Sequence, residues 1–226
     1  MMTVSTDSDA AATAAAPVNG SVPDRTWRFG PGWLVFVLVF GLLAGTAGGL
    51  LYPRLFGTPK DNSVEAGFLR DMSTHHAQAV EMAMIAHANS TNADVVTLAG
   101  DIALTQHGQI NYMQAWLRDW KLSPTSSTPP MAWMPGSEGA VVNGLMPGMA
   151  TPEQLATLRK ATGKDLDVQF LTLMRQHHLG GIHMAQEALV LSDNKDVDWL
   201  ATSMVSSQQG EITLIDAMLK KIQAQP

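Results

Sequence analysis

The chain has 226 residues, a net charge of −6 and no cysteine. The acidic balance argues against a nucleic-acid-binding protein, and the lack of cysteine excludes disulfides, thiolate catalysis and cysteine-ligated zinc. With 46% hydrophobic and 15% charged residues, the chain is too apolar to be disordered throughout. The 14 methionines and 7 histidines are the candidates for function, and their positions decide whether they pack or bind.

The N-terminal part of the chain predicts membrane targeting. Residues 1–30 are rich in Ala, Ser, Thr and Asp without a hydrophobic period, so we expect them to be disordered. Residues 31–56 are the predicted transmembrane signal-anchor, because their uncharged run from Trp33 to Tyr52 is long enough to cross a bilayer as a helix. An uncleaved anchor would cross the cell membrane once and leave the C-terminal domain extracytoplasmic. The alternatives are a signal peptide cleaved near residues 45–47, which gives a secreted protein, and a buried helix of a soluble domain.

Residues 57–226 are predicted to form one domain from a duplicated unit. The segment FLRDMSTHHAQAVEMA, which starts at Phe68, is identical at 7 of 16 positions to FLTLMRQHHLGGIHMA, which starts at Phe170. The same offset of 102 residues continues without a gap to the pair Leu117 and Leu219. A register that is held over this distance indicates an internal repeat.

Each unit, at about residues 61–121 and 163–224, is predicted to be a helical hairpin. Apolar residues recur at spacings of three and four in two stretches of each unit. Turn and cap residues separate the stretches, with Asn92 or Asp94 as the expected N-cap in the first unit. Two such hairpins bury their four apolar stripes in one bundle. The predicted fold class is therefore all-α, a four-helix bundle preceded by one transmembrane helix.

The linker between the units, residues 122–150, is rich in Pro, Gly and Ser and also contains methionines. After it, Thr151 and Pro152 predict the start of a short helix that runs to about Lys160 and is ended by Gly163. The linker methionines could plug the open end of the bundle or capture a metal. Met-Pro-Gly-Met would be an unusual plug, because Pro and Gly fix an extended turn that presents both thioethers, so both alternatives stay open. These methionines are Met131, Met134, Met146 and Met149.

The inward faces of the predicted helices combine histidine with methionine. A helical wheel places the adjacent histidines of each unit on the apolar face, where each ring nitrogen needs a partner: another imidazole, backbone, water or a metal. The methionines could also be core filler. The candidate metal ligands are His75, His76, His177, His178, Met72, Met82, Met174, Met184, Met146 and Met149. The polar residues on the inner faces of the companion helices, expected to support the ligands by hydrogen bonds, are Gln106, Gln109, Gln208 and Glu211.

Other polar residues are predicted to lie outside this layer. Glu81 and its repeat counterpart His183 fall opposite the apolar stripe and should face solvent. His107 also falls off the inner face, and His87 lies on its flank.

The ligand types predict which metal would bind. Thioethers are soft ligands and imidazoles are borderline, so together they favour Cu(I) or its mimic Ag(I), and imidazoles also accept Cu(II). Inward carboxylates are too few for Ca²⁺, Mg²⁺ or Mn²⁺. The sequence has no Glu-x-x-His pair for a di-iron centre, no discernible Ser-His-Asp arrangement and no Gly-rich phosphate loop.

The repeated F-x-x-x-M-x-x-H-H-x-x-x-x-x-M-A pattern, the Met-Pro-Gly-Met segment and the companion Gln-x-x-[Gln/Glu]-Ile motifs resemble a bacterial family known as domain of unknown function 305. The resemblance covers about residues 61–223. It implies a ferritin-like helical fold, export or membrane anchoring, and an association with copper and silver binding and tolerance. It places the His-His motifs of the family on the four histidines named above and its methionines on the six candidate methionine ligands. The equivalent residues Glu81 and His183 differ between the two units, so this position is doubtful as a ligand shared by both.

The leading hypothesis is a non-enzymatic copper-binding protein anchored in the membrane. It would sequester Cu(I) or deliver it to a copper-handling partner protein, which lowers the free metal concentration. A ferritin-like metal oxidase is the first alternative, although the sequence shows neither an open coordination position nor turnover. The second is an accessory structural subunit of a membrane complex, in which the histidines form only a hydrogen-bond network. The sequence predicts no oligomeric state.

Overall fold

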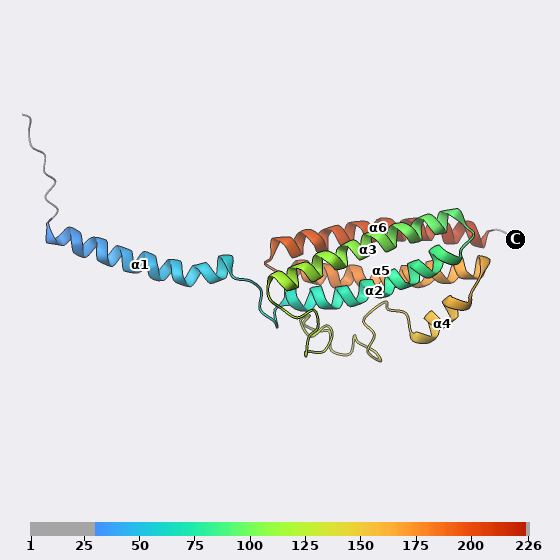
Figure 1. Cartoon of the computed structure of the whole chain (residues 1–226), viewed down its shortest axis with the longest axis horizontal. Coiled ribbons are helices and arrows are strands. Elements are labelled where there is room, and N and C mark those ends of the chain that lie inside the picture. Colours follow the sequence, from blue (N-terminus) through green and yellow to red (C-terminus); the bar gives the residue numbers. More distant parts are fainter. Residues whose placement is uncertain (1–29, 225–226) are drawn as a thin grey trace, which may run out of the picture. The chain divides into compact units, whose positions relative to one another are not determined.

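The computed structural model describes residues 30–224, with the side chains of residues 52–56 left out. This part of the chain contains six α-helices and no strand (Figure 1). The chain divides into two units, residues 1–56 and residues 57–226, which are described separately. The predicted disorder of residues 1–30 lies, apart from Gly30, outside the described residues.

The first unit contains α1, Pro31–Phe56. Pro31 stands at the first helical position, where its missing N–H costs no hydrogen bond. The segment Pro31–Leu51 is long and apolar enough to cross a membrane, by length and composition, and none of it is buried. A core helix of a soluble domain would be covered by other side chains, so the described part of the chain gives no support to that alternative.

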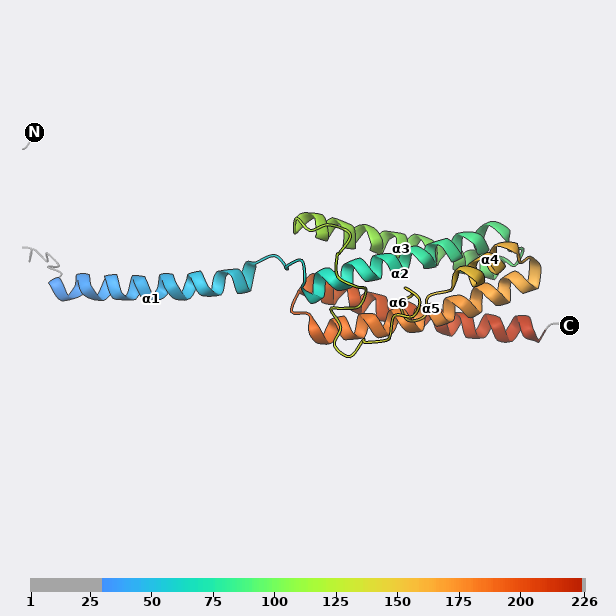
Figure 2. The same ribbon diagram turned by 90° about the horizontal axis from the view of Figure 1, so that it is seen from below.

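The second unit is a bundle of four long helices, shown from two directions in Figures 1 and 2. The first hairpin pairs α2 (Val64–Asn89) with α3 (Ala93–Asp119), and the second pairs α5 (Gly163–Leu191) with α6 (Lys195–Gln223). The hairpins pack mainly through α2 and α5, which run in opposite directions. This architecture confirms the predicted all-helical bundle.

The ends of the helices follow from local sequence. Asn92 is the N-cap of α3 and accepts a hydrogen bond from the Asp94 N–H, and its repeat counterpart Asn194 caps α6 in the same way. The short helix α4 (Pro152–Lys160) begins at the predicted Thr151 capping box. One boundary differs from the expectation, because Gly163 does not end α4 but is the first residue of α5, with φ of 54°.

Two apolar clusters fill the bundle, one on each side of its middle. The first cluster contains Met82 and Met174 and extends to α4 through Leu158. The second, here called the methionine-rich cluster, joins helical and linker residues. Its buried methionines are Met72, Met113, Met131, Met134, Met146, Met184 and Met204.

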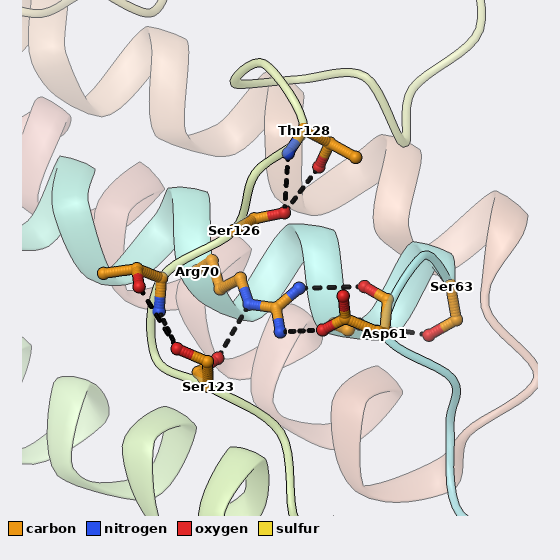
Figure 3. Close-up of polar contacts among 8 residues, drawn as sticks. Asp61, Ser63, Arg70, Ser123, Ser126 and Thr128 are labelled. Carbon is orange, nitrogen blue, oxygen red and sulfur yellow. Dashed lines mark hydrogen bonds and ion pairs between the residues drawn. The ribbon is translucent and has the colours of Figure 1, made fainter.

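Two charged residues of α2 hold the linker and the segment before α2 against the bundle. The buried Arg70 guanidinium donates from Nε to the Ser123 carbonyl, at 2.9 Å, and pairs with the carboxylate and carbonyl of Asp61 (Figure 3). The neighbouring Asp71 carboxylate accepts hydrogen bonds from the Met131 N–H, at 2.6 Å, and from the indole N–H of Trp133, at 2.9 Å. Charge-assisted hydrogen bonds are the stronger class, so the linker is fixed at its beginning.

Candidate metal centre

A polar layer crosses the bundle between the two apolar clusters, and all four long helices contribute to it. On α2 the histidine pair lies between Met72 of one cluster and Met82 of the other, and α5 repeats this order in reverse from Met174 to Met184. The layer consists of His75, His76, Gln106, Gln109, His177, His178, Gln208 and Glu211. The four histidine side chains are at most 1% exposed.

His75 and His177 meet at the centre of this layer. Their ring centroids are 3.8 Å apart and their planes are inclined by 36°. The two residues occupy the same position in the two units, and the antiparallel packing of α2 and α5 brings them together. The duplicated sequence therefore produces one shared histidine pair rather than two distant ones.

The second histidine of each unit is anchored by its own hairpin partner. The Nε2 of His76 is 2.8 Å from the Oε1 of Gln109, and the Nε2 of His178 bonds to the Oε2 of Glu211. An amide or carboxylate oxygen accepts, so Nε2 carries the proton in both histidines. Their Nδ1 atoms are left with free lone pairs.

Each of the four histidines has one buried ring nitrogen without a hydrogen-bond partner among the described residues. The atoms are Nδ1 of His75, His76 and His178, and Nε2 of His177. Both amide atoms of Gln106 and the Oε1 of Gln208, in the same layer, also lack partners among the described residues. Unpartnered buried polar atoms are costly. The donor chemistry therefore fits a bound species that accepts electron pairs from imidazole nitrogen.

Burial keeps the central histidines neutral. It lowers the pKa of His75 to about 4, although the Pro147 carbonyl opposes this shift. Burial and the neighbouring His75 lower the pKa of His76 to about 3. Burial also holds the pKa of His177 well below its usual value. Since only the neutral imidazole can bind a metal, these three rings are in the ligand form at neutral pH.

The Met-Pro-Gly-Met segment lies on the side of the bundle, not over its open end as the sequence suggested. We call residues 146–150 the strap. The Pro147 carbonyl accepts a hydrogen bond from Nε2 of His75 at 3.0 Å. Met146 is buried in the methionine-rich cluster, and Met149 is half-buried against it. The strap is therefore fixed beside the central histidine pair.

The structure brings the candidate ligands into one region without completing a metal cage. Among the described residues, no three His, Asp or Glu side chains form a group that could hold a metal ion. Imidazoles occupy the middle layer, and buried thioethers lie in the clusters on both sides of it. Such a donor set suits a soft ion of low coordination number better than a hard ion that needs many oxygen ligands.

The polar residues predicted outside the layer do lie outside it. Glu81 is partly exposed and pairs with Arg159, and His183 and His107 are exposed. His87 is exposed and its Nδ1 is 3.0 Å from the Val96 carbonyl.

Sequence reasoning missed Gln78, which is buried and bonds twice to Ala150 of the strap. The signal was available, because the repeat pairs Gln78 with Gly180, an unequal pair next to equal histidines.

The comparisons with known proteins agree with this architecture. Residues 65–219 match the family described as Domain of unknown function (DUF305). The crystal structure of a DUF305 protein from Streptomyces coelicolor, named as a presumed secreted protein, is 42% identical and has a TM-score of 0.67, with 74% of this chain and 98% of that chain covered. A DUF305 fragment from Deinococcus radiodurans is 31% identical and has a TM-score of 0.59, with 70% and 96% covered. The chain belongs to the DUF305 family.

A more distant likeness is to CopM, whose structure is known with bound copper. The Cu(II)-bound form is 24% identical and has a TM-score of 0.55, with 70% of this chain and 97% of CopM covered. The Cu(I)-bound form is 21% identical with the same TM-score, with 70% and 96% covered. At this identity the likeness shows the shared fold. The comparison with curated proteins gave no match.

Proposed function

We propose that this DUF305 protein binds copper as its cargo, mainly as Cu(I), and either sequesters it or delivers it to a partner protein. The observation that carries the proposal is the layer of four buried histidines, each with one unpartnered ring nitrogen. These neutral nitrogens and the thioethers on either side are ligands of the right softness for Cu(I). The copper-bound structures of CopM, which has the same fold, support the choice of metal.

The residues proposed to hold copper fall into two groups. The imidazoles of His75, His76, His177 and His178 would supply nitrogen. The thioethers of Met72, Met82, Met174, Met184, Met146 and Met149 would supply sulfur from the flanking clusters and the strap. Gln109 and Glu211 would orient the rings of His76 and His178, and Gln106 and Gln208 would bond to groups of the loaded layer.

The proposed location is the outer side of the cell membrane, with α1 as the anchor. The apolar length of Pro31–Leu51 supports the anchor, and the description of the Streptomyces relative as a presumed secreted protein supports export. Protease added outside intact cells should digest residues 57–226 while α1 stays in the membrane fraction. A mature chain that starts near Gly48 would show instead that the segment is a cleaved signal.

Metal analysis of paired alanine variants tests copper binding. We expect His75→Ala with His76→Ala, and separately His177→Ala with His178→Ala, to lose most of the copper that the parent chain binds. The matched control is His107→Ala with His183→Ala, which removes two exposed imidazoles. Circular dichroism checks folding, since removing a partner of a buried polar group costs about 1–3 kcal/mol. Unchanged copper content in both folded layer variants would refute the proposal, and oxygen consumption with Cu(I) would point to the oxidase alternative.

A further inference from the structure

The central histidine pair is enclosed on all sides in this structure. His75 and His177 are each 1% exposed, so a metal ion can reach them only when a covering segment moves. The four long helices are joined by fully buried side chains above and below the layer, which makes their separation costly. The strap, in contrast, is a non-helical segment that bonds directly to His75.

We infer that the strap is the gate through which copper reaches the histidine layer, and that Gln78 and Gly180 are the positioning residues that keep it closed. The inference rests on the proposed function and names how that site would be regulated. Three contacts along the strap carry it: one to the layer, one to α2 and one to α5.

The contact to α2 is a clasp made by one side chain. The amide of Gln78 donates from Nε2 to the Ala150 carbonyl at 2.9 Å and accepts from the Ala150 N–H at 2.6 Å. All of these groups are buried, so neither water nor another residue replaces the bonds when the strap is in place. Both of these side-chain hydrogen bonds to the C-terminal end of the strap come from a single residue, while the Ala150 methyl group packs in the first apolar cluster.

The contact to α5 depends on the absence of a side chain. A Cβ at Gly180 would lie 1.9 Å from the Pro147 carbonyl oxygen and 2.5 Å from its carbon. A Cβ at Gly148, which has φ of 82°, would lie 2.4 Å from the carbonyl oxygen of Gln176. The strap backbone thus sits directly on the helix backbone, and this position is available only while both residues are glycine.

The repeat explains why these two residues differ. Gln78 and Gly180 occupy equivalent positions in the two units, on the helices that flank the strap. The strap contacts both positions, Gln78 through hydrogen bonds and Gly180 through the close approach of Pro147. Gly180 leaves the space that the strap backbone occupies.

Two variants of the full-length chain open the gate from opposite sides. Gln78→Ala removes both bonds to Ala150. Gly180→Ala adds a methyl group that excludes Pro147, while alanine favours the helical conformation of α5. The matched control is Gln209→Ala, which shortens an exposed glutamine on α6. In each protein, Cu(I) uptake from a weak colorimetric chelator is followed by stopped flow, and hydrogen exchange of the Ala150 amide is measured without metal.

We expect both gate variants to take up Cu(I) about tenfold faster or more, and to lose protection of the Ala150 amide, while the control behaves as the parent. Faster exchange without faster uptake in both variants would overturn the gate. Parent-like exchange and uptake in both would also overturn it. A parent chain that takes up no Cu(I) would instead refute the proposed function itself.

Discussion

In the first repeat unit His75 is bonded to the strap and His76 to the neutral amide of Gln109. In the second unit Nε2 of His177 has no hydrogen-bond partner among the described residues, and His178 is bonded to the carboxylate of Glu211. The two histidine pairs are identical in sequence and equivalent in the fold. Their surroundings make them chemically different. The donor strength and the free nitrogen of each imidazole thus depend on its hydrogen-bond partners on the companion helix and the linker, not on the histidine motif.

The largest expected effect tests what the two units share, which is neutral buried histidine. The pKa of His75, His76 and His177 is lowered on folding, so the unfolded chain binds these protons first as the pH falls below about 6.5. Stability is therefore complete above that pH and declines below it, until the folded pKa is reached. Each ring contributes about 1.4 kcal/mol per pH unit, or about 4 kcal/mol for the three.

Urea unfolding of the metal-free chain between about pH 7 and pH 5 measures this slope. Glu211 is the acidic residue bonded to the layer, through Nε2 of His178. His75→Gln and His177→Gln should each reduce the slope, and the exposed His107→Gln serves as the control. A free energy of unfolding that does not change with pH would contradict the neutral layer.

The next effect separates the two units. His178→Ala leaves the mostly buried carboxylate of Glu211 without its partner and should cost about 3 kcal/mol of stability. His76→Ala leaves only the amide of Gln109 and should cost about 1–2 kcal/mol. The double variant His178→Ala with Glu211→Gln should recover part of the difference in urea unfolding. Equal losses for the two single variants would show that the carboxylate and the amide are equivalent here.

The smallest effect is expected when the hydrogen-bond partners of His76 and His178 are exchanged. A carboxylate bonded to a ligand histidine makes the ring a stronger donor, and losing such a partner costs about 10–100-fold in metal affinity. We expect Glu211→Gln to weaken copper binding by about this factor and Gln109→Glu to strengthen it. A competition titration of Cu(I) with a colorimetric chelator measures both. If the Cu(I) affinity of both variants changed in the same direction, the carboxylate of Glu211 would not make the second unit the stronger copper ligand.

Much of the bundle was predictable because the apolar residues of an amphipathic helix recur at spacings of three and four. The spacing of Phe68, Met72, His75 and Met82 identified the inward face, and the repeat then predicted the same face around His177. The hairpins, the capping box at Thr151 and the polar layer followed from these local patterns. The structure has each of them where the sequence indicated.

The strap was not predictable in the same way. Residues 122–150 have no period, and backbone groups such as the Pro147 carbonyl carry no sequence signal at all. Which nitrogen of each histidine is anchored also depends on three-dimensional contacts between helices far apart in the chain. The difference between Gln78 and Gly180 was visible in the repeat, but the sequence did not show that the strap contacts both residues.

The single connection between the hairpins has a consequence for any protein built by tandem duplication. Copying a unit doubles every side chain it contains, yet two copies need only one joint. The bundle therefore contains one linker that has no counterpart in the repeat. This linker makes different contacts with the two repeat units. Here the linker passes beside the pair His75 and His177, where the two units meet. The two halves of the bundle therefore differ on the side where the linker lies, and with the proposed gate copper would reach the centre from that side only.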